Sequence, residues 1–97
     1  MIKHIILWDF TKEIKDNNKE KETLNYIKES VNTLKNIKGL LDIGITNNLS
    51  ETSDLVFYSE FDNIESLKLF QSHPLHEVHK NRCKNIVENR RVIDFEI

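Results

Sequence analysis

The chain has 97 residues, of which 38% are apolar and 31% are charged, and its formal net charge is −2. This length suits one small domain, so we expect residues 1–97 to fold as a single unit. The near balance of charges provides no basic surface, which argues against nucleic acid as a partner. No apolar run approaches the roughly 20 residues that cross a bilayer. The only cysteine, Cys83, cannot form an intrachain disulfide. We therefore expect a cytoplasmic protein with no membrane partner.

A strand is predicted from Lys3 to Phe10, because these residues are mainly β-branched, aromatic or aliphatic. Side chains alternate between the two faces of a strand. One face would carry His4, Ile6, Trp8 and Phe10, and the other Ile5 and Leu7. Both faces are largely apolar, which is typical of a central strand. The polar stretch that follows, from Thr11 to Glu22, is predicted to be mainly a loop.

Two amphipathic helical regions are predicted from apolar residues that recur at helical spacing. The first begins at Thr23, a suitable N-cap, and ends at Gly39. Its buried face would carry Leu24, Ile27, Val31, Leu34 and Ile37. The second is capped by Asn63 and carries Ile64, Leu67 and Phe70. Pro74 interrupts it and begins a further helix through about Val87, because proline fits the first turn of a helix but not its interior.

Three further strands complete the pattern. Leu41, Ile43 and Ile45 alternate with other residues, and turn formers over 47–53 precede a strand from Leu55 to Phe61. The last strand is predicted from Arg91 to Ile97. The order β-α-β-β-α-β indicates an α+β fold of the ferredoxin-like type, in which two helical regions cover one face of a four-stranded antiparallel sheet. The other face would be open at Ile5 and Leu7, so we infer a homodimer whose sheets meet face to face.

The histidines are the clearest candidates for chemistry. His73 and His76 flank the only proline of the chain, and His4 lies on the first predicted strand. Imidazoles can move protons near neutral pH. His73, His76 and His79 recur every third residue, with Cys83 one turn beyond. Helical steps of three residues turn by about −60° each, so these donors fan over roughly 120° instead of converging. We therefore expect no metal site.

Several pieces of the chain occur in a distinctive order. They are Ile2 to Phe10, Gly44, Tyr58-Ser59-Glu60-Phe61, His73-Pro74-Leu75-His76 and Val92-Ile93-Asp94-Phe95. In this order they resemble the stress-responsive dimeric α/β-barrel family, often called Dabb, over nearly the whole chain. The resemblance implies a dimeric α+β barrel that is built from ferredoxin-like protomers.

The resemblance also implies a site. The best understood chemistry of the family is like that of olivetolic acid cyclase, in which two histidines and a tyrosine promote the aldol cyclisation of a polyketide thioester. His4 and His76 match the two histidines, whereas Phe70 occupies the tyrosine position and lacks the hydroxyl. The implied pocket lining is Ile6, Trp8, Phe57, Phe70 and Val87. Such a lining suits a largely apolar ligand with one polar centre. No cofactor is implied.

Two functions fit these residues. In the first, the protein binds a small, largely apolar carbonyl compound, and His4 and His76 cyclise or isomerise it by general acid–base chemistry. In the second, it is a non-catalytic, stress-related structural dimer in which Trp8, Phe57 and Phe70 fill the space. Asp94 would orient an imidazole in the first case. In the second it would form a hydrogen bond at the sheet edge or dimer interface.

Overall fold

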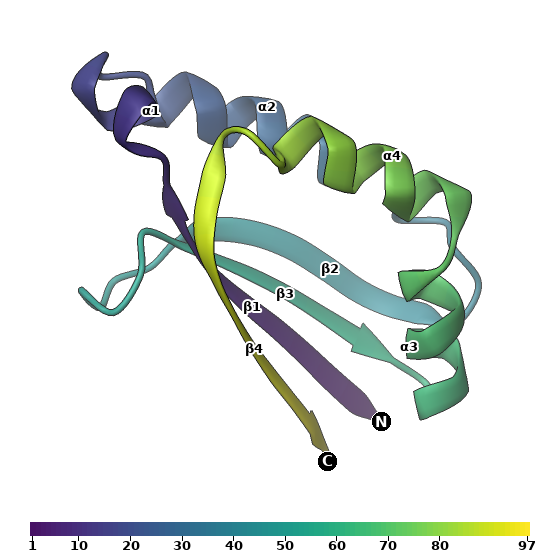
Figure 1. The fold of residues 1–97 in the computed structure, drawn as a ribbon. Helices are drawn as coiled ribbons and strands as arrows, with labels where there is room; N and C mark the ends of the chain where they lie inside the picture. Colours follow the sequence, from purple (N-terminus) through teal and green to yellow (C-terminus); the bar gives the residue numbers. More distant parts are fainter.

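The computed structural model describes residues 1–97 as four strands and four helices (Figure 1). The elements are β1 (Ile2–Phe10), α1 (Lys12–Asp16), α2 (Glu20–Asn32), β2 (Leu40–Asn47), β3 (Leu55–Phe61), α3 (Ile64–Gln71), α4 (Pro74–Cys83) and β4 (Val87–Glu96). The strand order is β2-β3-β1-β4, and all neighbouring strands are antiparallel. The predicted ferredoxin-like α+β arrangement is confirmed. None of the helices combines the length and the apolar character needed to cross a membrane.

The long helices lie on one side of the sheet, as Figure 1 shows. Burial alternates along β1, whose helix-covered face carries Ile2, His4, Ile6, Trp8 and Phe10. On the opposite face Ile5 is only partly buried, and it pairs with Tyr58 on one side and Ile93 on the other. Because paired residues point the same way, these side chains share one apolar surface. The predicted open face of the sheet is therefore present.

The first long helix begins about one turn earlier than predicted. Lys19 is the N-cap of α2, and Thr23 is buried within the helix instead of capping it. Glu20 and Glu22 lie in the first turn. Their negative charges stabilise a helix at this position because they face the positive end of its dipole.

One short helix was not predicted, and other element ends differ from the predicted ones. The stretch expected to be a loop contains the short helix α1. The α-helical part of α2 ends at Asn32, and a series of tight turns leads from there to Gly39. α4 ends at Cys83, because the Ile86 N–H donates to the Cys83 carbonyl in a turn that reverses the chain. Val87, expected late in the helix, is instead the first residue of β4.

The predicted alternation along β2 holds only in part. Ile43 and Ile45 are buried as expected, but Leu41 is 53% exposed. The pairing of β2 with β3 shifts between Leu40 and Asp42. A bulge of this kind inserts one extra residue and turns it away from its neighbours. Leu40 therefore takes the place against the core that the sequence pattern assigned to Leu41.

The break between α3 and α4 follows the predicted signals. The Asn63 side chain accepts a hydrogen bond from the Ser66 N–H at 2.9 Å and caps α3. Pro74 lies in the first turn of α4, and His73 caps that helix by accepting from the Leu75 N–H at 3.1 Å. The break redirects the chain so that α4 runs back over the sheet (Figure 1).

Gly39 provides a test of this backbone path. Its φ is +86°, and a Cβ at this position would lie 2.2 Å from Ser66 Oγ. We predict that Gly39→Ala lowers the free energy of unfolding by about 1–3 kcal/mol, because both the backbone and the contact become strained. Urea unfolding at fixed protein concentration measures the loss. In a Ser66→Gly background the contact is absent, so the loss should shrink without vanishing. An equal loss in both backgrounds would contradict the assigned contact.

Candidate functional site

His4 is held between the sheet and the helices by its neighbour on β4. The side chain is 2% exposed, and its Nδ1 forms a hydrogen bond with the carboxylate of Asp94. The two residues are directly opposite in the pairing of β1 with β4. A carboxylate only accepts hydrogen bonds, so Nδ1 carries the proton. Nε2 is therefore the ring nitrogen that remains available to a ligand.

His76 is bonded in a different way. Its Nδ1–H donates to the Gln71 carbonyl at 3.2 Å, which again leaves Nε2 free. Burial is the largest cause that lowers the pKa of His76, and a positive charge on His4 lowers it further. The charge of His4 therefore reaches His76, although it is the smallest of the causes that act on the pKa of His76. A neutral His76 with a free Nε2 can accept a proton.

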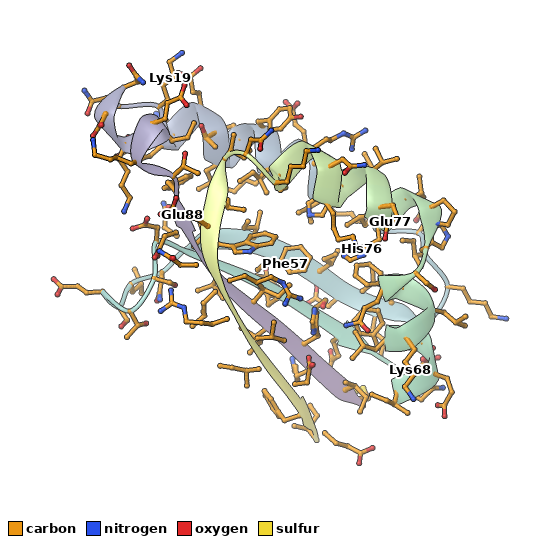
Figure 2. The ribbon with its side chains drawn as sticks, viewed as in Figure 1. Lys19, Phe57, Lys68, His76, Glu77 and Glu88 are labelled. Atoms are coloured by element: carbon orange, nitrogen blue, oxygen red, sulfur yellow. The ribbon has the colours of Figure 1, made fainter.

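A row of rings over β3 locates His76 relative to the sheet. The centroid distances along the row are 5.0 Å for Phe61–Phe70, 4.6 Å for Phe70–His76, 6.3 Å for His76–His79 and 5.9 Å for His79–Phe57. His76 stands in the middle of this row and points from α4 toward the sheet (Figure 2). Ser59 lies in the middle of β3, beneath this row of rings, and it is paired with His4 on β1. His76 therefore lies above the part of the sheet that holds His4.

The predicted lining residues are closely packed, and they do not all lie at this point. Phe57 and Phe70 belong to the row of rings, whereas Val87 pairs with Phe10 at the other end of β1 from His4. All of them are buried, namely Ile6, Trp8, Phe57, Phe70 and Val87. The rings of Trp8 and Phe57 lie 5.8 Å apart. Five hollows of about 230–470 Å³ on the protein are lined by other residues. At the β4 edge beside His4, Val92 is 38% exposed and the Asp94 side chain is 42% exposed.

His79, considered in the sequence only as a metal donor, is a buried member of the same row of rings. It is 1% exposed, and its Nδ1 lies 2.7 Å from Ser30 Oγ on α2. Burial is the main cause that lowers the pKa of His79 to about 4, so the ring is neutral at pH 7. The spacing from His76 was a usable signal, because residues three apart lie on neighbouring parts of one helix face. Nothing in the sequence indicated that Ser30 on α2 would be the hydrogen-bond partner of His79.

The donors of α4 do not gather around a common point. His73 caps the helix, His76 bonds the Gln71 carbonyl and His79 bonds Ser30. No group of three histidine, cysteine or acidic side chains is placed to hold a metal ion. Burial raises the pKa of the Cys83 thiol to about 11, so it is not a thiolate near neutral pH.

The buried His79 makes stability depend on pH. Its pKa is about 4 in the folded protein and 6.5 when unperturbed, so the unfolded chain binds more protons between these values. The free energy of unfolding should therefore fall as the pH drops from 6.5 toward 4, with a His79 contribution on the order of 2–3 kcal/mol. We predict a smaller fall in His79→Gln, the remainder coming partly from His76. Urea unfolding at pH 7 and pH 4.5 tests this, and an unchanged fall in the variant would contradict it.

Known proteins share this arrangement. The family model of the stress responsive A/B barrel domain matches residues 2–97. A protein from Bacteroides fragilis, described as dimeric with a ferredoxin-like fold, is 25% identical at a TM-score of 0.83, covering 99% of this chain and 95% of that chain. A dabb family protein with a ferredoxin-like fold from Mesorhizobium loti is 22% identical at a TM-score of 0.77, with coverage of 99% and 95%.

A protein from Arabidopsis thaliana has the same fold at 17% identity and a TM-score of 0.83, covering 100% of this chain and 95% of that chain. Comparison with curated proteins gave no match. The family model spans both helix-bearing halves of the sheet and includes His4, His76 and Asp94. The chain therefore belongs to the stress responsive A/B barrel domain family.

Proposed function

We propose that the protein is a homodimer that binds a small, largely apolar carbonyl compound beside His4 and His76 and removes a proton next to the carbonyl group. The observation that carries this proposal is the unequal bonding of two neighbouring histidines. His4 is paired with a carboxylate, whereas His76 is bonded to a neutral backbone carbonyl and has a lowered pKa. Two histidines that are held by different partners are suited to different roles in an acid–base site.

His76 is the base in this mechanism. Its free Nε2 takes a proton from the carbon next to the carbonyl group, and an enolate forms. Its position in the first turn of α4 supports this role, because the positive end of the helix dipole disfavours the imidazolium.

His4 is the partner acid. When protonated, it donates Nε2–H to the carbonyl oxygen while Asp94 balances its charge and holds the ring in place. Return of the proton to another carbon gives an isomer. Attack of the enolate on a second carbonyl of the same substrate gives a cyclised product.

Phe70 sets the character of the substrate in this proposal. Its ring packs 4.6 Å from that of His76, at the position where the resemblance implies a tyrosine. A phenyl ring donates no hydrogen bond, so the developing enolate depends on His4 for its stabilisation. The surrounding apolar side chains favour a substrate that is apolar outside its carbonyl groups.

The open face of the sheet supports the homodimer. Its apolar side chains are Ile5, Leu7, Val56, Tyr58, Ile93 and Phe95. Tyr58, Ile93 and Phe95 are each at least 40% exposed in the single chain. A contiguous apolar surface of this kind favours association, and the Bacteroides fragilis relative is described as dimeric. A cytoplasmic location is part of the proposal, because the lone Cys83 is a free thiol.

The close packing of the site favours a second candidate, a structural dimer without turnover. Trp8, Phe57 and Phe70 are each at most 9% exposed and occupy the space beside the histidines. In this case the His4–Asp94 bond ties β1 to the edge strand β4, and the stress-related role depends on the assembly. The two candidates differ in whether a ligand displaces these side chains.

The dimer proposal predicts that Leu7→Asp weakens association, because an unpaired charge would enter an apolar interface. Leu49→Asp is the matched control, since Leu49 is fully exposed on the β2–β3 loop. Sedimentation at micromolar concentration should give about twice 11.5 kDa for the unchanged chain and for Leu49→Asp. A well-folded monomer of the unchanged chain would overturn the proposal.

The catalytic proposal predicts that His4→Ala and His76→Ala each lower turnover by roughly 10²-fold or more, the usual range for a lost acid or base. His73→Asn is the matched control, because it removes a histidine from the same segment and keeps an N-cap. A panel of β-keto thioesters, followed by product chromatography, provides the assay.

The pH profile gives a second measurement of the same chemistry. Only neutral His76 accepts a proton, and burial lowers its pKa below 6.5. We therefore expect kcat/KM to be retained at neutral pH and to fall on the acidic side, with an apparent pKa below 6.5. Absence of turnover across the panel, together with unmoved histidine NMR signals when the compounds are added, would favour the structural dimer.

A further inference from the structure

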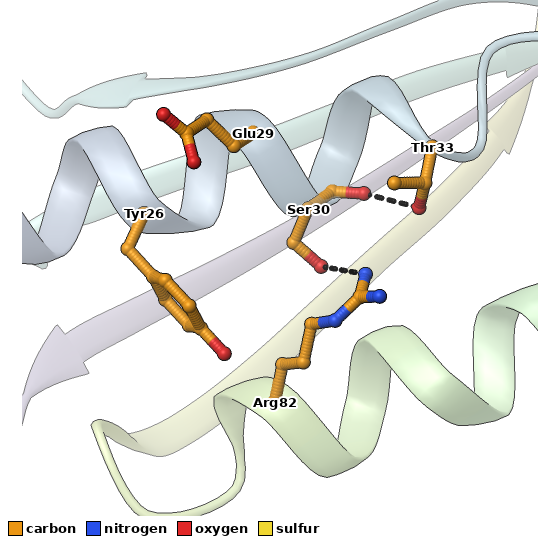
Figure 3. A pocket seen from close by; sticks show the side chains of 5 residues that line it. All are labelled: Tyr26, Glu29, Ser30, Thr33 and Arg82. Carbon is orange, nitrogen blue, oxygen red and sulfur yellow. Dashed lines mark hydrogen bonds between the residues drawn. The ribbon is translucent and has the colours of Figure 1, made fainter.

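We propose that a crevice between α2 and α4 binds a small organic carboxylate through Arg82. This crevice opens on the helical surface (Figure 3), and neither His4 nor His76 lines it. Two adjoining hollows form it, and both are lined by Tyr26 and Arg82. The proposal concerns a second binding site and does not depend on the catalytic proposal.

Arg82 has hydrogen-bonding capacity that the protein does not use. Its guanidinium takes part in no salt bridge and donates one hydrogen bond, from Nη1 to the neutral Ser30 Oγ at 3.1 Å. Glu29 lines the same hollow, but Figure 3 shows its carboxylate pointing away from Arg82. A guanidinium has five N–H donors in a fork that matches a carboxylate. The remaining N–H donors of Arg82, which is half-buried, are therefore free to bind a carboxylate.

The guanidinium is held in place by buried groups. Ser30 is 3% exposed and His79 is 1% exposed. Because Ser30 Oγ accepts from Arg82, its own proton is directed to Nδ1 of His79, 2.7 Å away. Burial keeps His79 neutral at pH 7 by lowering its pKa to about 4, so the ring can accept this proton. The chain of bonds orients Arg82 before any ligand arrives, which lowers the entropy cost of binding.

The shape of the crevice indicates what kind of group the ligand carries besides its carboxylate. The hollow at Ser30 and Thr33 has a volume of about 230 Å³. The adjoining hollow, of about 360 Å³, adds Ile86 and the charged Lys19 and Glu22. Figure 3 shows that the Tyr26 ring and the Arg82 side chain face the same gap between the helices. A carboxylate on Arg82 would therefore extend its apolar part along Tyr26 and Ile86.

The charges around the crevice favour a carboxylate over phosphate. One guanidinium faces the inner hollow, and the two hollows together also carry Lys19, Glu22 and Glu29. The two carboxylates offset the two cationic side chains, so a dianion would be repelled more strongly here than a monoanion. A monoanion is matched by Arg82 alone.

NMR titration of the intact protein tests the site. The probes are acetate, hexanoate, 3-phenylpropionate and inorganic phosphate. We expect saturable shifts of the Arg82 Nε–H and His79 ring signals, with affinity rising from acetate to 3-phenylpropionate and a Kd on the order of 1 mM. Arg82→Gln should weaken binding about tenfold or more. Arg82→Lys should give an intermediate loss, because it keeps the charge but not the fork.

Lys84→Gln is the matched control, since it removes the same charge two residues farther along and should bind like the unchanged chain. If Arg82→Gln does not fold, Ser30→Ala replaces it, and its loss of the Arg82 anchor should weaken binding severalfold. The proposal is overturned if the carboxylates give no saturable shifts, or if the variant measured binds as tightly as Lys84→Gln. Tighter binding of phosphate than of 3-phenylpropionate would overturn the choice of ligand.

Discussion

The structure depends on one constraint, which is that the helices cover a single face of a four-stranded sheet. The opposite face keeps apolar side chains such as Ile93 and Phe95 in solvent. On the covered face the protection ends at the edge strand, where Val92 and Asp94 are partly exposed while His4 on the next strand is buried. The same limited cover therefore leaves an apolar surface on the open face and an exposed carboxylate beside a buried histidine.

The break at Pro74 places His76 over the same part of the sheet. Without it, the helical region that begins at Ile64 would continue in one direction, and His76 would not lie above the sheet. With it, α4 returns over β3 and sets His76 and His79 among the rings of Phe57 and Phe70. The cost of burying these imidazoles as cations lowers the pKa of both. The break at Pro74 thus links the fold to the chemistry, because it places His76 and His79 where burial lowers the pKa of each imidazole.

Much of the fold was predictable, because its signals are local. Alternation along β1 fixed which side chains face the helices, and Asn63 and Pro74 marked the ends of α3 and α4. The predictions that were wrong concern residues whose positions depend on contacts between distant parts of the chain. The exposed position of Leu41 depends on a bulge in the pairing with β3. Val87 leaves the helix because the chain must turn to reach the sheet edge.

The site was predictable to a smaller extent. His4, His76 and Asp94 follow from the resemblance, and the pairing of His4 with Asp94 follows once both strands are in register. Their roles stay predictions. The chain of bonds through Ser30, His79 and Arg82 was not predictable, because it depends on how α2 packs against α4. The spacing of polar residues along the chain gives little information about how two helices pack against each other.

The central claim is that His4 and His76 are held by different partners, each of which keeps the ring proton on Nδ1 and leaves Nε2 to act on a ligand. Long-range ¹H–¹⁵N NMR of the histidine rings at neutral pH measures this most directly, because it reports which ring nitrogen carries a proton. The account predicts that Nδ1 is protonated in both rings and that Nε2 of His76 is unprotonated. A His76 that carries its proton on Nε2, or a His4 that lacks one on Nδ1, would contradict it.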